Sequence, residues 1–305
     1  MNRSRFGLLT IAVTGALALS ACGGGGDENP LSNDATKAPS DTIVVGSADF
    51  TENNIIAQIY AGALEAKGVK VSTKLNIGSR EAYLPGLTDG SIDVIPEYTG
   101  NLLLNYDPKA TQSAAEDVYT ALKSKLPAEL ILLEKSPAQD ADTYTVTKDT
   151  ATKYSLTTIK DLAPVAKNLT LGGANTLKTR SYGVPGLKEK YGVTFKSFKT
   201  LDPGGPLTIK ALKSGAVDVA DVFSTDVNIA NNNWVVLQDP EEMIPAQSVT
   251  PLINKAKASD TVSAALNAVS AKLTTEGLLD LNKKAADGAD PSTVAKDWLT
   301  QNGLS

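Results

Sequence analysis

The chain has 305 residues, of which 42% are hydrophobic and 21% charged, with one cysteine, no histidine and a formal net charge of −5. The missing histidines exclude Ser-His-Asp triads, acid–base catalysis by imidazole and zinc sites built from imidazole. The single cysteine excludes an internal disulfide. The net negative charge excludes the extended basic surface with which proteins bind nucleic acid. We therefore expect no cofactor, no metal site and no nucleic-acid partner.

The first segment predicts export and a lipid anchor. Two arginines precede an apolar run over residues 6–19, which is typical of a secretory signal and short for a membrane span. The four residues that end at Cys22, Leu-Ser-Ala-Cys, match the bacterial lipoprotein box. We expect residues 1–21 to be a signal peptide, Cys22 to be lipidated and residues 22–41 to be a flexible tether. The alternative is an uncleaved anchor helix with an incidental cysteine.

Strands and helices alternate behind this tether. Hydrophobic periodicity predicts strands at 43–46, 69–75, 92–95 and 130–133, and helices at 51–67, 79–90 and 113–126, the first with Thr51 as its N-cap. Such alternation indicates an α/β fold with a mostly parallel sheet and helices on both faces. Ligands of these sheets bind at the carboxyl ends of the strands.

A second lobe follows, and the chain then returns to the first. A polar–apolar alternation at 143–146 predicts one crossing strand, and 248–253 predicts another. The patterns between them predict strands at 169–172, 193–198, 217–222 and 234–237, and helices at 185–190 and 207–213. Tail helices at 259–273, 275–286 and 292–302 should pack on the first lobe. We assign residues 42–143 and 249–305 to lobe 1 and 144–248 to lobe 2, joined by a two-strand hinge that permits rigid-body closure.

Three segments of the first lobe recur in the second in the same order. Residues 87–94 return as 212–219 at a lag of 125, with weaker matches of 45–49 to 171–175 and of 65–69 to 189–193. Each copy of the main repeat is followed by an aromatic residue and hydroxyls, Tyr98-Thr99 in one and Phe223-Ser224-Thr225 in the other. Two related lobes that present such loops to each other form a cleft for a small molecule. The repeated Asp93 and Asp218 lie between apolar residues, so we expect them to bind nearby backbone amides.

Four motifs resemble the osmoprotectant-binding proteins of bacterial ABC importers, which bind glycine betaine, choline and carnitine. They are GSADFTE at 46–52, PEYTG at 96–100, LDPGGPLT at 201–208 and VFSTD at 222–226. The resemblance implies a two-lobed periplasmic-binding-protein fold of type II that delivers its ligand to a membrane permease. Together with the lipid anchor, it implies a monomeric receptor held at the outer face of the cell membrane.

The family resemblance also implies a site, a box of aromatic rings around a quaternary ammonium. A trimethylammonium group donates no hydrogen bond, and the negative faces of aromatic rings attract it instead. Carried over by position, the predicted walls are Tyr98, Tyr144 and Phe223, with the hydroxyls of Thr99 and Ser224 beside them. Arg180 is the predicted partner of a ligand carboxylate, and Asp142 neutralises the cation or orients Arg180. Asp49 in the first motif and Gln247, where many relatives have a tyrosine, complete the predicted site.

Three other interpretations remain open. The missing aromatic at Gln247 leaves room for another zwitterion or an uncharged polar solute. Asp93 and Glu97 suggest a carboxylate pair for an exported glycosidase, although they lie four residues apart in a strand-to-loop segment and need not converge. The last alternative is a structural surface lipoprotein. No nucleophile–base arrangement is visible, so we expect no enzyme.

Overall fold

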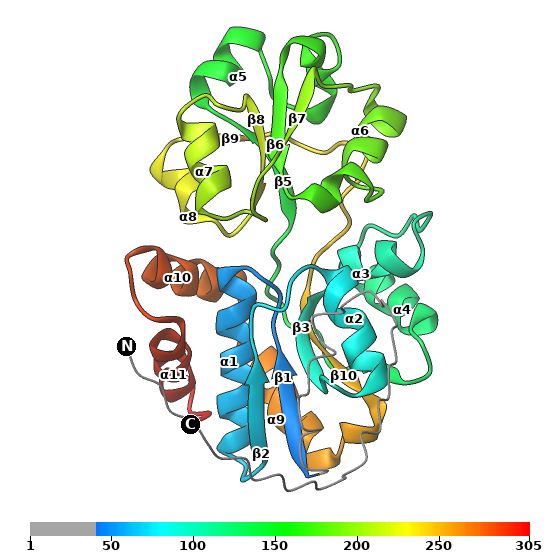
Figure 1. Cartoon of the computed structure of the whole chain (residues 1–305), viewed down its shortest axis with the longest axis vertical. Helices are drawn as coiled ribbons and strands as arrows, with labels where there is room; N and C mark the ends of the chain where they lie inside the picture. Colours follow the sequence, from blue (N-terminus) through cyan, green and yellow to red (C-terminus); the bar gives the residue numbers. More distant parts are fainter. Residues whose placement is uncertain (1–40) are drawn as a thin grey trace, which may run out of the picture. The chain divides into compact units, whose positions relative to one another are not determined.

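The computed structural model describes residues 41–305, so the predicted signal peptide, Cys22 and nearly all of the tether lie outside the described residues. Within residues 41–305 no helix is both long and apolar enough to span a membrane. This part of the chain forms two five-stranded sheets, each flanked by helices (Figure 1). The two-lobed α/β architecture predicted from the sequence is therefore confirmed.

The first sheet has the strand order β2-β1-β3-β10-β4. Strand β1 pairs in parallel with β2 and β3, whereas β10 is antiparallel to both β3 and β4. The sheet is thus mixed rather than mostly parallel, because β10 enters it from the other lobe. Its strands are β1 (Thr42–Gly46), β2 (Lys70–Lys74), β3 (Val94–Tyr98), β4 (Leu130–Leu132) and β10 (Val249–Asn254), and its helices are α1 (Thr51–Glu65), α2 (Arg80–Asp89), α3 (Thr99–Tyr106) and α4 (Ala115–Lys125).

The second sheet repeats this plan in the order β7-β6-β8-β5-β9. Strand β6 pairs in parallel with β7 and β8, and the crossing strand β5 is antiparallel to β8 and β9. The strands are β5 (Asp142–Val146), β6 (Thr170–Gly173), β7 (Ser197–Thr200), β8 (Val219–Phe223) and β9 (Val235–Val236). The helices are α5 (Lys148–Tyr154), α6 (Val184–Tyr191), α7 (Pro206–Lys213) and α8 (Val227–Asn231), with 3₁₀ turns η1 (Ile159–Leu162), η2 (Ala166–Asn168) and η3 (Asn175–Lys178).

The tail helices return to the first lobe, as predicted. Helices α9 (Asp260–Ser270), α10 (Thr275–Ala286) and α11 (Pro291–Gln301) follow the short 3₁₀ turn η4 (Lys255–Lys257). Val262, Leu278 and Trp298 from these helices share one buried apolar cluster with Ile55 and Ile59 of α1. These helices lie beside α1 (Figure 1), and their packing fixes this helix, whose first turn lines a hollow in the surface.

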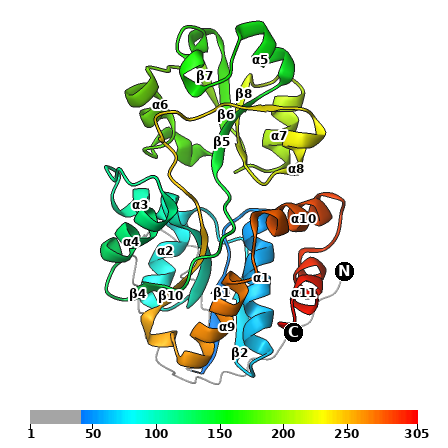
Figure 2. The same cartoon turned by 180° about the vertical axis from the view of Figure 1, so that it is seen from behind.

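Two antiparallel segments, 133–141 and 237–248, connect the lobes (Figure 2). The backbone N–H of Asp140 donates to the carbonyl of Gln247 (3.2 Å), and Gln139 forms an antiparallel bridge with Ser248. This pairing makes the predicted two-strand hinge. The boundary expected between residues 143 and 144 falls inside β5, all of which belongs to the second sheet.

Two local expectations have clear outcomes. Helix α1 begins at Thr51 with Phe50 as its N-cap, and no side chain caps it, so the prediction of Thr51 as the cap is wrong.

The repeated aspartates are structural, as predicted. The backbone N–H of Val44 donates to Asp93 Oδ2 (2.8 Å), and that of Thr170 donates to Asp218 Oδ2 (2.8 Å). The internal repeat thus preserves the same carboxylate–amide contact in both sheets.

The repeat also preserves a close packing contact at a glycine. A Cβ added to Gly46 would lie 2.9 Å from Ile92 Cγ2, and one added to Gly172 would lie 2.8 Å from Val217 Cγ1. Both distances are too short for a contact between carbon atoms. The first strand of each copy, β1 or β6, therefore needs glycine where a branched side chain packs against it. The recurrence of glycine and branched residue together explains why these short segments still match.

Candidate functional site

A cavity of about 390 Å³ lies between the lobes, where β1, β3, β6 and β8 end. This is the edge at which the alternation of strands and helices predicted a ligand site. Both lobes contribute to the lining, which consists of residues 48–50, Ser79, Arg80, Tyr83, Tyr98, Asn101, Asp140, Asp142, 174–177, Arg180, Thr200, Leu201, Pro203, Asp221 and Phe223. A wider hollow of about 780 Å³ shares Asp49, Phe50, Pro203 and Phe223 with this cavity and reaches α7 and α10.

Three aromatic rings meet at the cavity. The ring centroid of Phe50, which follows β1, lies 5.9 Å from that of Tyr98 at the end of β3. It lies 5.0 Å from the centroid of Phe223 at the end of β8, with the planes tilted by 57°. The two rings predicted from the repeat therefore approach from opposite lobes. Phe50 joins them, and the sequence reasoning missed it although it belongs to the GSADFTE motif.

A buried carboxylate links Tyr98 to the second lobe. The Tyr98 hydroxyl donates to Glu52 Oε1 (2.8 Å), while Thr225 Oγ1 and Asn282 Nδ2 both donate to Glu52 Oε2 (2.6 Å each). Burial raises the pKa of Glu52. Asp140 of the hinge accepts from the backbone N–H of Thr225 (3.1 Å), and burial together with the charge of Glu52 raises the pKa of Asp140.

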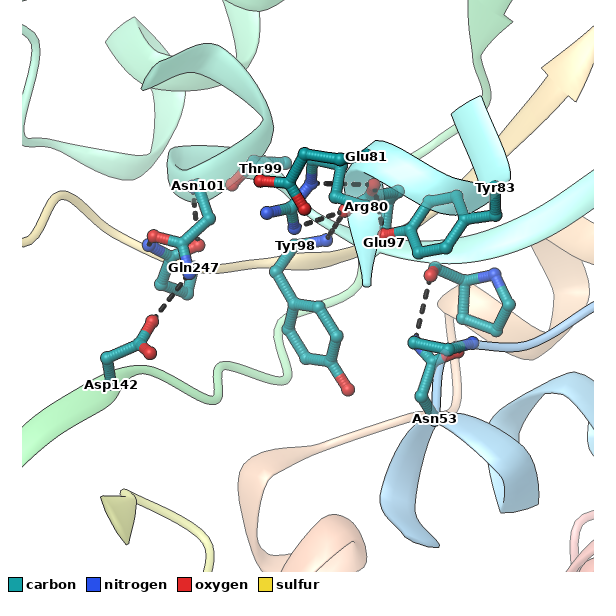
Figure 3. A network of polar contacts seen from close by, with 12 residues as sticks. Asn53, Arg80, Glu81, Tyr83, Glu97, Tyr98, Thr99, Asn101, Asp142 and Gln247 are labelled. Carbon is teal, nitrogen blue, oxygen red and sulfur yellow. Dashed lines mark hydrogen bonds and ion pairs between the residues drawn. The ribbon is translucent and has the colours of Figure 1, made fainter. Parts of the chain in front are cut away.

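An ion pair forms another wall of the cavity (Figure 3). Arg80 Nε and Nη2 donate to the two carboxylate oxygens of Glu97 at 2.9 and 2.7 Å. The Tyr83 hydroxyl and the backbone N–H of Tyr98 also donate to Glu97 (2.7 and 3.0 Å). Glu97 is fully buried and binds these groups, while Asp93 binds the backbone of Val44. The two acids considered for glycoside hydrolysis thus have separate structural partners.

Gln247 reaches the cavity only through Asn101 (Figure 3). Its side chain accepts from the backbone N–H of Asn101 (2.9 Å) and donates to Asn101 Oδ1 (2.7 Å). Asn101 Nδ2 in turn donates to Asp142 Oδ2 (2.5 Å), which connects α3 of the first lobe to β5 of the second. Gln247 is fully buried and does not line the cavity, whereas Asn101 and Asp142 do.

Arg180 lines the cavity and bridges the lobes. Its Nη2 lies 3.1 Å from Oε2 of Glu81 on α2, and its Nη1 donates to the Tyr182 hydroxyl (2.8 Å). Partial burial alone would raise the pKa of Glu81, but the hydrogen bond and charge of Arg180 outweigh it and hold that pKa at about 2. Part of the Arg180 side chain, 21%, stays accessible to a ligand.

Besides Gln247, the structure places three of the predicted residues outside the cavity lining. Thr99 donates to the carbonyl of Ala246 (3.2 Å) and accepts from the backbone N–H of Ser248 (3.1 Å). The Tyr144 ring packs in the core of the second lobe, and its hydroxyl donates to the carbonyl of Tyr182 (2.8 Å). Ser224 accepts from the backbone N–H of Ala141 (2.9 Å). A direct ligand contact by these three residues stays a prediction.

The cavity therefore combines predicted and unpredicted groups. Of the predicted residues it is lined by Asp49, Tyr98, Asp142, Arg180 and Phe223. Sequence reasoning missed Phe50, Arg80, Tyr83, Asn101, Asp140 and Asp221 as lining residues. Asp221 lies just beyond the repeated segment and corresponds to Pro96 in the first copy, so the repeat contained no signal for it.

Residues 41–301 match the family model described as the substrate binding domain of ABC-type glycine betaine transport systems, OpuAC. The chain belongs to this family. It is accordingly the extracytoplasmic substrate-binding component of an ABC transporter and works with permease components in the membrane.

Two curated relatives agree with this OpuAC assignment. The glycine betaine-binding protein YehZ of Escherichia coli is 29% identical over 280 residues, which cover 86% of this chain and 90% of YehZ. The carnitine transport binding protein OpuCC of Listeria monocytogenes is 28% identical over 304 residues, which cover 96% of this chain and 94% of OpuCC.

A solved structure shows the same fold as this OpuAC protein. The crystal structure of a glycine betaine/carnitine/choline ABC transporter aligns with a TM-score of 0.67 and 24% sequence identity. The alignment covers 86% of this chain and 99% of that chain. The likeness extends over both lobes and confirms the type II arrangement of two sheets.

Proposed function

We propose that the chain binds a small quaternary-amine solute in the 390 Å³ cavity and delivers it to the permease of an importer. The observation that carries this proposal is the convergence of Phe50, Tyr98 and Phe223 from both lobes on one cavity. Each ring face stabilises a desolvated cation by about 0.5–2 kcal/mol. Relatives named for glycine betaine and carnitine support the same class of ligand.

The charges around the cavity also favour a cation. Four aspartates line it, whereas each of its two arginines already faces a glutamate outside the lining, Arg80 with Glu97 and Arg180 with Glu81. The aspartates that remain ionised make the potential in the cavity negative. The accessible part of Arg180 favours a second candidate, a zwitterion whose carboxylate meets this guanidinium.

Calorimetric titration tests the cation requirement. We expect at least one of choline, glycine betaine and carnitine to bind with a Kd of roughly micromolar, about −8 kcal/mol. The matched control is 3,3-dimethylbutan-1-ol, which has the shape of choline without its charge. We expect it to bind at least about tenfold more weakly, since cation–π attraction vanishes with the charge. Equal affinity for the control, or no binding by any of the three amines, would falsify the proposal.

We also propose that the receptor is a monomer without enzymatic activity, anchored by a lipid on Cys22 and tethered by residues 22–41. Expression of the full chain in a bacterial host with an alkyne-labelled fatty acid tests the anchor. The wild type should incorporate the label, and Cys22→Ser should not, because it offers no thiol for acylation. Absence of label from the wild type, or equal labelling of both proteins, would contradict the anchor.

A further inference from the structure

Asp221 is a buried carboxyl that faces the cavity without an ordinary partner. It lies on β8, is 3% exposed and lines the cavity. Among the described residues, the only side chain that shares a hydrogen bond with it is another carboxyl, that of Asp142. Burial of a carboxyl without a donor is unfavourable, and native proteins provide a donor for nearly all such groups. A hydrogen-bond donor on a molecule in the cavity would therefore satisfy this carboxyl.

Asp142 lies beside Asp221 on the neighbouring strand. Strand β5 is antiparallel to β8, with Tyr144 opposite Asp221 and Asp142 opposite Phe223. Asp142 is 8% exposed, and Asn101 Nδ2 donates to its Oδ2 (2.5 Å). No other donor from the described residues reaches the Asp142 side chain, so the two carboxyls present more acceptor oxygens to the cavity than these residues satisfy.

Two adjacent buried carboxyls cannot both ionise at little cost. Burial, and then the charge of Asp142, raise the pKa of Asp221 well above its ordinary value, and Arg180 opposes this only in part. Arg180 is engaged by Glu81 and Tyr182. The other titratable groups around the pair are Tyr144 on β5, Tyr182 before α6 and Arg80 on α2. The adjacency of the two buried carboxyls therefore favours a single proton shared between them.

We propose that Asp142 and Asp221 form a separate subsite, which accepts a hydrogen bond from a hydroxyl on a cationic ligand and releases the shared proton to solvent when the cation binds. The inference rests on the proposed function, because it places the quaternary ammonium against the rings. Choline meets both conditions, with its trimethylammonium at Phe50 and its hydroxyl at the acid pair. Glycine betaine brings a carboxylate that donates no hydrogen bond and is repelled there. The subsite thus selects hydroxylated quaternary amines over betaines.

Calorimetry on the full chain tests the subsite with choline, its O-methyl ether and glycine betaine. We expect choline to bind about tenfold or more tightly than the ether, which has the same charge but no donor. In buffers of different ionisation enthalpy, the heat of choline binding should vary with a slope that corresponds to release of up to one proton. Choline affinity should accordingly rise with pH through the range in which the acid pair titrates.

Asp221→Asn should abolish this proton release and weaken choline binding about tenfold, whereas Asp149→Asn, on the exposed face of α5, should change neither. If the Asn variant does not fold, the buffer dependence of the wild type decides alone. Tighter binding of glycine betaine than of choline, or a binding heat that is independent of the buffer, overturns the subsite while quaternary-amine binding stands. Absence of binding by every amine overturns the proposed function itself.

Discussion

Arg80→Ala is expected to lower the free energy of unfolding by about 3–5 kcal/mol, because it leaves a buried charge without its counter-ion. The Arg80 and Glu97 side chains are only 7% and 0% exposed, and two guanidinium nitrogens bind the two carboxylate oxygens. After the substitution only the Tyr83 hydroxyl and the Tyr98 amide remain as donors to Glu97. Urea denaturation at neutral pH measures the loss.

Two further variants serve as controls for the effect of Arg80→Ala on stability. Glu97→Gln in the Arg80→Ala background should recover part of the stability, since no uncompensated charge is then buried. Lys283→Ala breaks an ion pair with Asp287 in which both side chains are more than 60% exposed, and it should change stability by less than about 1 kcal/mol. A loss for Arg80→Ala no larger than that for Lys283→Ala would show that the buried pair has no special role.

Phe50→Ala is expected to weaken quaternary-amine binding by about 30-fold, which corresponds to roughly 2 kcal/mol for a ring over a desolvated cation. Phe50 contacts both Tyr98 and Phe223, so its removal also frees the other two rings. Titration calorimetry with the tightest-binding amine gives the change in Kd. The ring lies at the surface of the cleft, and thermal denaturation should show a much smaller effect on folding.

Phe50→Leu separates ring electrostatics from packing. Leucine keeps an apolar side chain in contact with its neighbours but has no negative π face. We expect Phe50→Leu to lose most of the affinity for the charged ligand and little of the weak affinity for 3,3-dimethylbutan-1-ol. If both variants bind the amine within threefold of the wild type, Phe50 is not part of the cation site.

Much of the architecture was predictable because both signals, periodicity and internal repetition, arise from burial. Central strands such as β1 and β3 are buried and contain short apolar runs. The repeats coincide with contacts that both sheets need, such as Asp93 with Val44 and Asp218 with Thr170. Three helices escaped prediction. Helix α3 follows β3 without a connecting loop, α5 is polar on nearly every face with only Ala151 buried, and α8 has five residues, none of them buried. None of these segments shows an amphipathic period of useful length.

The site was less predictable because it depends on depth within the sheets rather than on residue type. Asp142 and Tyr144 belong to the same strand, yet only Asp142 lines the cavity, whereas Tyr144 packs in the core. On β8, alternation places Val222 in an apolar cluster on the opposite face from Asp221 and Phe223, but it does not show which residues of that face border the cleft. Such distinctions follow from where β5 and β8 reach the cleft, and local sequence contains no measure of that.

Glu52 accepts hydrogen bonds from Thr225 of the second lobe and from Asn282 of α10, and Asn282 Nδ2 also lies 3.0 Å from Thr225 Oγ1. These contacts join three segments that are distant in the sequence. A hinge motion that draws the lobes apart has to transfer the Glu52 carboxylate into water. Helix α10 therefore contributes to the contacts that hold the lobes together. A truncation before α10 would change the equilibrium between the open and closed receptor as well as the packing of the first lobe.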